Sequence, residues 1–409
     1  MTTRLVSFHH RLEGMTGHRY TEALGLVAAT KARGMELSLF VSERADASIR
    51  AALPMGRPVL HCPVFRPGLS FDERTADFMR MLHQHLDPVV RKDDWVLVTT
   101  GTQCEARALA AWLGQTPFDR RPWTLTLIHS DRWNRYGAEE RQRQVDEFHV
   151  VASELAQLDP DAKLRFIVGS LTDDLCEELS GMLGTMVSRV PQILPSQGYV
   201  PAIQKPAAAP PLVGIVGGAR AEKGSHLIPA IIKATRELKP LNFVVQLANE
   251  LYSAEAFAEL ANALDEPGIE VVRGPLDQLT YQSLLARCDL FLLPYQRVPY
   301  KKRASGIFVE AALTGRPAVV PSETWMADQI SAGAAAGTFY DGDEPMAIAA
   351  ALVSAAEALP DLALQARMLA PEWQRTMTLD VFLDWLQAEI GRRQATGKLV
   401  HAATTVDAE

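Results

Sequence analysis

The chain has few cysteines and no long run of apolar residues. Its 409 residues include four scattered cysteines and no Cys-x-x-Cys pair. This spacing argues against a disulfide framework or a thiolate zinc site, and it fits a reducing compartment. The sequence also lacks a signal-peptide apolar region and the roughly 18 uninterrupted apolar residues of a membrane helix. We therefore expect a cytoplasmic protein, with peripheral contact at the inner face of a membrane left open.

Positive charge is also in short supply. The chain carries 41 lysines and arginines against 49 acidic residues, a net charge of −8. Proteins that bind nucleic acid usually carry a basic surplus, so this balance argues against a nucleic-acid partner. Apolar residues make up 47% of the chain and charged residues 22%, which is ordinary for a globular protein. A chain of this length is too long for one core, and we expect two domains.

Short apolar runs alternate with helix-like stretches along the whole chain, and a Pro/Ala-rich, almost uncharged segment interrupts them near residue 200. The alternation predicts an α/β fold of two tandem Rossmann-like domains, each built on a parallel sheet covered on both faces. The expected segments are 1–195 for an N-terminal domain, 196–211 for a linker, 212–371 for a C-terminal domain, 372–395 for a helix returning to the first domain, and 396–409 for a disordered tail.

Residues 300–321 (YKKRASGIFVEAALTGRPAVVP) form the most informative stretch. Three cations at 301–303 precede a predicted helix, for which Ser305 is the expected N-cap and Gly306 the first residue. Glu310 lies one to two turns inside that helix. Apolar runs on both sides predict strands, so the basic loop should lie at the carboxyl end of a parallel sheet, where such sheets bind ligands. A helix N-terminus framed by cations is typical of an anion site.

A second glycine loop occupies residues 214–229 (GIVGGARAEKGSHLIP). It follows a predicted strand and opens a helix expected to begin at Ser225. Gly217 and Gly218 would expose backbone N–H groups, and Arg220 and Lys223 would add two cations at the helix N-terminus. Amides, helix dipole and cations together predict a diphosphate site. The alternative is that both cations are ordinary surface residues.

The first half of the chain gives weaker signals. Gly14 and Gly17 follow the first predicted strand, where they would let the backbone approach a ligand or the facing domain; a simple tight turn is an equal alternative. His129 follows a predicted strand at residues 123–128, at the edge where a sheet presents its chemistry. The alternative for His129 is that it satisfies backbone groups in its loop.

The two motifs of the second half together resemble those of the retaining nucleotide-sugar glycosyltransferases of the GT-B fold, in the large family-four group. The resemblance implies that Arg220 and Lys223 hold the donor diphosphate and that Glu310 contacts the ribose hydroxyls. It also places His129 near the donor sugar and the first glycine loop over the donor phosphates. In the family's retaining mechanism the leaving phosphate helps to take the acceptor proton, which would explain why no pair of catalytic carboxylates stands out.

The chain departs from the family at one position. The Glu-x7-Glu motif of the family would place its first Glu at residue 302, where this chain has Lys. We interpret Lys302 or Arg303 as a changed sugar or phosphate contact. The residues expected to act in catalysis are His129, Arg220, Lys223 and Glu310. Those expected to bind the donor are Gly14, Gly17, Gly217, Gly218, Lys302, Arg303, Ser305 and Gly306.

The resemblance implies a hexosyltransferase-type enzyme that moves a sugar from a nucleoside diphosphate to a hydroxyl of a polysaccharide or lipid-linked glycan, with retention. No cofactor is expected, and no metal, because His9, His10 and His18 lack a ligand spacing. Two alternatives stay open: a catalytically inactive scaffold of the same fold, which Lys302 would favour, and another GT-B enzyme such as a sugar-nucleotide epimerase. The sequence does not predict the base, the sugar or the oligomeric state.

Overall fold

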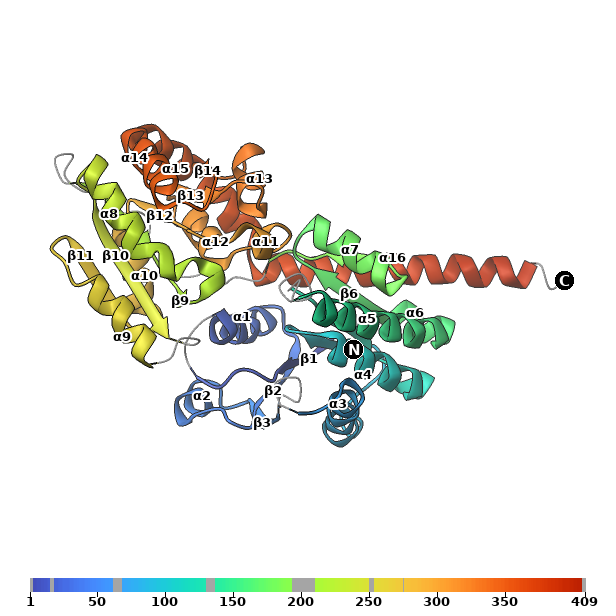
Figure 1. The fold of residues 1–409 in the computed structure, drawn as a ribbon. Coiled ribbons are helices and arrows are strands. Elements are labelled where there is room, and N and C mark those ends of the chain that lie inside the picture. Colours follow the sequence, from blue (N-terminus) through green and yellow to red (C-terminus); the bar gives the residue numbers. More distant parts are fainter. Residues whose placement is uncertain are drawn as a thin grey trace. The chain divides into compact units, whose positions relative to one another are not determined.

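The computed structural model describes residues 3–14, 18–61, 68–129, 137–192, 210–249, 254–274 and 276–406. Contacts divide the chain into a first unit, Met1–Pro195 with Thr378–Glu409, and a second unit, Ser196–Met377. Each unit contains a parallel sheet of seven described strands flanked by helices, so the predicted α/β architecture is confirmed (Figure 1). The linker expected at 196–211 lies outside the described residues up to residue 209.

The first sheet has the strand order β3-β2-β1-β4-β5-β6-β7, and every pair is parallel. Its strands are β1 Arg4–His9, β2 Glu36–Ser42, β3 Arg57–Leu60, β4 Trp95–Val98, β5 Trp123–Leu127, β6 Phe166–Ser170 and β7 Val187–Arg189. The helices of this unit are α1 His18–Ala32, α2 Ala47–Ala52, α3 Phe71–His85, α4 Gln103–Gln115, α5 Ala138–Gln157, α6 Pro160–Arg165, α7 Asp173–Leu183 and α16 Leu379–Val406.

Both faces of the first sheet are buried, as the two-residue side-chain period of β1 illustrates. Val6 and Phe8 point into a core made with α3, α4, α5 and α7. Leu5 points to the other face, into a cluster with α1 and α16 that includes Phe382 and Leu386. The C-terminal helix therefore packs on the first unit, which confirms the expected return of the chain.

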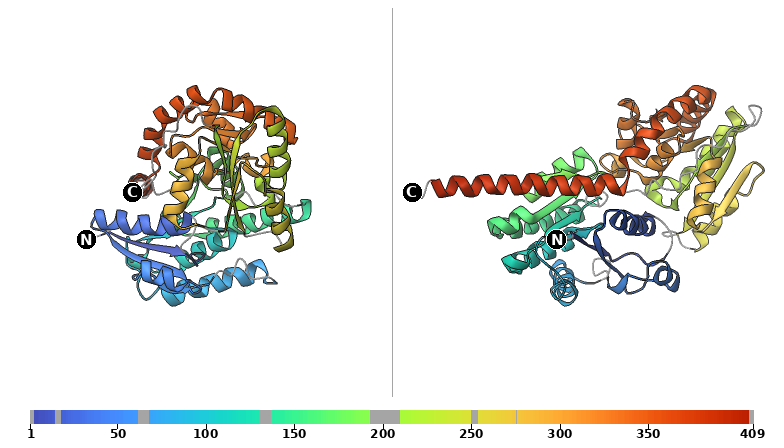
Figure 2. Two further views of the ribbon diagram at one scale, coloured as in Figure 1. Left: turned by 90° about the vertical axis from the view of Figure 1, so that its left-hand side faces the viewer. Right: turned by 180° about the vertical axis from the view of Figure 1, so that it is seen from behind.

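Helix α16 is longer than predicted. It continues to Val406, whereas the sequence suggested an end at 395 and a disordered tail at 396–409. Arg393 donates to the carbonyls of Leu164 and Phe166, and a Cβ at Gly397 would lie 2.8 Å from Leu164, so the helix runs close against α6. The helical residues beyond 395 include no proline, the residue that most strongly stops a helix, although Gly397 and the threonines are poor helix formers. In Figures 1 and 2 its last turns extend past the rest of the first unit.

The second sheet has the order β11-β10-β8-β12-β13-β14, with β9 pairing to β10. Its strands are β8 Leu212–Ile215, β9 Gly218–Ala219, β10 Asn242–Asn249, β11 Ile269–Arg273, β12 Leu290–Leu292, β13 Ala318–Pro321 and β14 Gly337–Tyr340. The helices are α8 Ile228–Leu238, α9 Ala254–Ala263, α10 Gln278–Arg287, α11 Arg297–Tyr300, α12 Gly306–Leu313, α13 Trp325–Ser331, α14 Pro345–Glu357 and α15 Leu359–Thr376. Helices α8, α9 and α14 share one hydrophobic cluster with the sheet.

Two helices of the second unit differ from their predicted bounds. Helix α8 begins at Ile228 instead of Ser225, after two 3-10 turns at Ala221–Lys223 and Ser225–Leu227. Pro229 explains the later start, because proline favours the first turn of a helix. Helix α15 continues through Pro371, the residue at which the second domain was expected to end. Its last turns are held in place because Trp373 Nε1 donates to the carbonyl of Ala334 at 2.7 Å.

Among the described residues, no single helix has the length and apolar composition needed to cross a membrane. Helices α14 and α15 meet these criteria only as a pair, and the two are bent by 78°.

Candidate functional site

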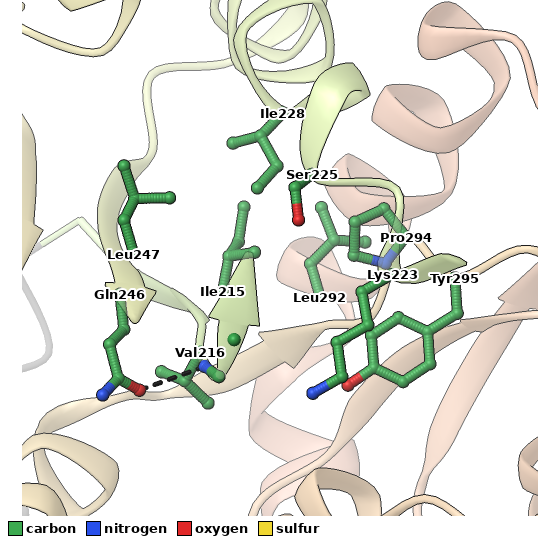
Figure 3. A pocket seen from close by; sticks show the side chains of 12 residues that line it. Ile215, Val216, Lys223, Ser225, Ile228, Gln246, Leu247, Leu292, Pro294 and Tyr295 are labelled. Carbon is green, nitrogen blue, oxygen red and sulfur yellow. Dashed lines mark hydrogen bonds between the residues drawn. The ribbon is translucent and has the colours of Figure 1, made fainter. Parts of the chain in front are cut away.

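The carboxyl edge of the second sheet holds a small pocket at the point where the strand order reverses. Strand β8 pairs with β10 on one side and with β12 on the other. Ligands of open α/β sheets bind at such switch points. The pocket is open to solvent, which makes up part of its empty space of about 290 Å³, and Figure 3 shows its lining. The lining residues come from β8, β10, β12 and the loops that follow: Ile215, Val216, Gly217, Gly218, Lys223, Ser225, Ile228, Gln246, Leu247, Leu292, Pro294 and Tyr295.

The loop after β8 is folded tightly around its glycines. Gly217 has φ 113° and Gly224 has φ 67°, conformations that side chains disfavour. A Cβ at Gly224 would lie 1.8 Å from the carbonyl oxygen of Pro294. The Gly217 N–H donates to Gln246 Oε1 at 3.0 Å (Figure 3). An anion contact at the Gly217 amide, as the sequence predicted, would therefore require this bond to break.

Lys223 is the central cation of the pocket. Burial is the largest cause that lowers its pKa, to about 8, and the nearby charges of Arg220 and Arg303 lower it further. Glu310 and Glu222 act in the opposite direction. These four side chains are therefore within electrostatic reach of one ammonium group, and three of them, Arg220, Arg303 and Glu310, are predicted site residues that the fold brings together with Lys223.

Two arginines share one carboxylate beside the pocket. Glu222 Oε1 lies 3.9 Å from Arg220 Nη1 and 3.7 Å from Arg303 Nη1. The Arg303 guanidinium is 5.0 Å from the centre of the Tyr300 ring. The Arg220 backbone is fixed by Ser225, whose Oγ accepts from the Arg220 N–H at 2.9 Å. The two predicted motifs thus meet through Glu222, a residue that the sequence reasoning did not single out.

Aromatic rings form the wall behind the cations. The Tyr295 and Tyr300 rings lie 4.4 Å apart, and Lys223 Nζ is 5.5 Å from the Tyr295 ring centre. Figure 3 shows the Lys223 side chain running beside Tyr295. Burial raises the pKa of Tyr295 well above its ordinary value, so its hydroxyl stays neutral. These rings reduce the access of water to the cations and so strengthen their charge interactions.

Helix α12 carries the predicted carboxylate into the same site. Ser305 caps the helix as predicted, and its Oγ accepts from the Phe308 N–H at 3.3 Å. A Cβ at Gly306 would meet nothing within 4 Å. Glu310 Oε2 accepts from the hydroxyl of Tyr281, on α10, at 2.5 Å. Lys302 lies in the bend between α11 and α12 and is partly buried.

The remaining predicted residues belong to the first unit. His129 follows β5, and its Nε2 donates to the carbonyl of Thr99 at 2.9 Å. This bond corresponds to the alternative of a histidine that satisfies backbone groups. Among the described residues, a Cβ at Gly14 would contact Asp46 alone, at 3.5 Å, which is an ordinary van der Waals distance. Gly17 lies outside the described residues.

Three buried ionisable groups in the first unit were not expected from the sequence. Burial lowers the pKa of His9 to about 4 and of His10 to about 3, and it raises that of Glu22 to about 8. All three are therefore mostly uncharged at pH 7. No group of three or more His, Cys, Asp and Glu side chains that could hold a metal occurs in the described part of the chain.

The sequence reasoning also missed Gln246 and Tyr281. Gln246 interrupts the apolar run of β10 close to its carboxyl end, and that position was a usable signal for a site residue. Tyr281 gave no such signal, because an aromatic residue inside a helix is normally part of a core. Only the fold brings Tyr281 beside Glu310.

Comparisons with known proteins place the fold. No protein-family model and no curated protein matches the chain. The chain does match solved structures. Sucrose-phosphate synthase from Thermosynechococcus elongatus is 13% identical, with a TM-score of 0.65 over 98% of this chain and 100% of that one. Anabaena HepE in complex with UDP is 14% identical, with a TM-score of 0.64 over 96% and 100%.

The catalytic domain of starch synthase IV from Arabidopsis thaliana, bound to ADP and acarbose, is 12% identical, with a TM-score of 0.59 over 96% of this chain and 99% of that domain. These structural neighbours are GT-B glycosyltransferases. At such low identity the likeness concerns the fold, and it extends over nearly the full length of both chains. The chain has the two-domain GT-B fold.

Proposed function

We propose that this chain is a glycosyltransferase that moves a sugar from a nucleoside diphosphate to an acceptor hydroxyl. The observation that carries the proposal is the cluster of Arg220, Lys223, Arg303 and Glu310 at the switch point of the second sheet. Cations at that edge suit a diphosphate, and a carboxylate suits ribose hydroxyls. The complexes of the structural neighbours with UDP and ADP support a nucleotide donor.

In this proposal the cations contribute most of the catalysis, by stabilising the leaving diphosphate. Negative charge builds on the diphosphate as the glycosidic bond breaks, and preorganised positive groups stabilise that charge. Lys223 would contact the leaving diphosphate with Arg220, while Glu310, oriented by Tyr281, would accept from the ribose hydroxyls. The leaving phosphate would help to take the acceptor proton, with retention at the sugar. No metal and no further cofactor is part of this mechanism.

The acceptor side of the proposal rests on the family resemblance. We place the acceptor among hydroxyls of polysaccharides or lipid-linked glycans, and we assign His129 to the donor sugar. Its Nε2 is engaged with Thr99, so Nδ1 is the atom that would face the sugar. Lys302 occupies the position of the first carboxylate of the family motif, so we propose Lys302 or Arg303 as a changed sugar or phosphate contact.

Two substitutions test the site. Lys223→Ala should lower the rate of sugar transfer about 100- to 1000-fold, because it removes a preorganised positive charge. Glu310→Ala should weaken nucleotide binding about 10- to 100-fold, because it removes a charged acceptor. Calorimetry with UDP, GDP and ADP, and product analysis with the matching donors, measure both effects. The control is Lys233→Ala, at an exposed lysine of α8. This substitution should change neither the rate of sugar transfer nor the affinity for nucleotide.

The outcomes separate the alternatives. Wild-type turnover and affinity in both variants would refute the assignment of the site. Nucleotide binding without transfer or donor hydrolysis would support the catalytically inactive scaffold. A nucleotide-sugar product with altered configuration would support an epimerase.

A further inference from the structure

We infer that Glu222 is an internal counter-anion, which partly neutralises Arg220 and Arg303 until a diphosphate displaces its carboxylate. The inference rests on the proposed function, since it concerns how the same site takes its ligand. It adds a residue that weakens binding of the donor and favours release of the product diphosphate. It also predicts which property of the ligand controls the affinity, namely the charge of its phosphates.

The contacts that pair Glu222 with the two arginines are charge contacts, longer than hydrogen bonds. The same oxygen, Oε1, lies 3.9 Å from Arg220 Nη1 and 3.7 Å from Arg303 Nη1. Arg303 Nη1 is buried and has no hydrogen-bond partner. A buried guanidinium nitrogen without an acceptor is costly, and phosphate oxygens are its preferred partners. The arrangement therefore leaves Arg303 with more to gain from a phosphate than it has from Glu222.

The backbone around Glu222 is held in place by the neighbouring loop. The carbonyl of Glu222 accepts from the Gln296 N–H at 3.0 Å, which ties the turn before α8 to the loop after β12. The Arg303 side chain lies over Tyr300. The side chain of Glu222 is 19% exposed, so part of it contacts solvent. In this inference a diphosphate displaces the carboxylate through a change of rotamer, while the backbone of the turn keeps its position.

The charges around Lys223 indicate whether removing the charge of Glu222 should strengthen or weaken diphosphate binding. Arg220, Lys223 and Arg303 meet Glu222 and Glu310, so the cluster carries one net positive charge when Lys223 is protonated. A diphosphate brings at least two negative charges. Neutralising Glu222 raises the positive charge that the ligand meets, and it should tighten binding in proportion to the charge of the ligand.

The test is Glu222→Gln, which keeps the shape and removes the charge. Calorimetry at pH 7 and low salt compares UDP, GDP, ADP and inorganic pyrophosphate with uridine, which has no phosphate. We expect the variant to bind pyrophosphate and the preferred diphosphate about 3- to 10-fold more tightly, and uridine unchanged. The gain should shrink at 0.5 M salt, because ions screen partly exposed charges. Arg303→Gln should weaken the same ligands.

The matched control is Glu237→Gln in α8. Glu237 is exposed, carries the same charge, and lies nine residues after the start of that helix, about 14 Å along its axis. It should leave every affinity unchanged. Equal affinities of Glu222→Gln and wild type for diphosphates would overturn the inference but leave the proposed function standing. If wild type bound none of the diphosphates, the proposed function would fail as well.

If Glu222→Gln does not fold, Glu222→Asp gives a second readout. The shorter carboxylate keeps the charge but moves away from the guanidinium groups, so diphosphate binding should tighten by less than in the Gln variant. Looser diphosphate binding in either variant would show that Glu222 supports the ligand, and it would contradict the inference.

Discussion

Lys223 gives the candidate site a pH dependence that can be measured. Burial, with the nearby charges of Arg220 and Arg303, lowers its pKa from 10.5 to about 8. The ammonium group is therefore mostly charged at pH 7 and loses its proton as the pH rises through about 8. A diphosphate favours the charged form, so binding above that pH must take up a proton. Diphosphate affinity should fall above pH 8, by up to about tenfold per pH unit.

Calorimetric titrations between pH 6.5 and 9.5 check this expectation, and Lys223→Arg is the control. Arginine keeps its charge throughout the range, so the affinity of that variant should vary much less with pH. A wild-type affinity that stays constant from pH 7 to 9.5 would contradict the prediction, because it would mean either that Lys223 does not contact the phosphates or that its pKa is not lowered toward 8.

The sequence predicted several residues of the site but not the hydrogen bonds that they form. The strand-loop-helix order placed Arg220, Lys223 and Glu310 at one edge of a parallel sheet, and the fold brings them together. Glycine at 217 predicted an open backbone, but Gln246, 29 residues later, accepts from its N–H. That bond depends on the pairing of β8 with β10, which no local pattern specifies. The hydrogen bond from Tyr281 to Glu310 joins two helices, and it could not be predicted from the sequence either.

At the scale of elements, apolar runs predicted the strands well, and helix ends were less predictable. Gly315 ends α12 in a left-handed conformation with φ 67°, as its type and position suggested. Pro371 suggested an end that α15 does not have, because contacts such as that of Trp373 with Ala334 stabilise the turns beyond it. Local signals predict an end only where no neighbouring element stabilises the continuation.

The turn into α8 is the element whose shape the site depends on most. Gly224→Ala should lower the free energy of unfolding by about 2–4 kcal/mol, because it combines a positive φ with a clash against Pro294. Gly306→Ala makes the same chemical change where a Cβ meets open space, and it should stay within about 0.5 kcal/mol of wild type. Urea unfolding measures both. Equal stabilities would show that the turn can relax, and that its tightness does not position Lys223.

At the scale of the whole molecule, each unit has its own core and the described pocket belongs to one of them. Phe382 of α16 is fully buried against the first sheet, whereas every lining residue of the pocket lies in the second unit. We expect the stabilities of the two units to respond to different changes. Phe382→Ala should destabilise the first unit by about 3–5 kcal/mol. The control is Gln387→Ala, at an exposed residue of the same helix, which should leave the stability of the first unit unchanged.

A nucleoside diphosphate at 100 times its dissociation constant should stabilise the second unit by about 2.7 kcal/mol. Hydrogen exchange separates the two responses, because the amides of β1 and α16 report on the first unit and those of β8 and α12 on the second. In Phe382→Ala, exchange should become faster in β1 and α16 while the ligand still protects β8 and α12 with unchanged affinity. If the substitution weakened nucleotide binding as much as it destabilised the first unit, the two units would form one cooperative system, and the site could not be assigned to the second unit alone.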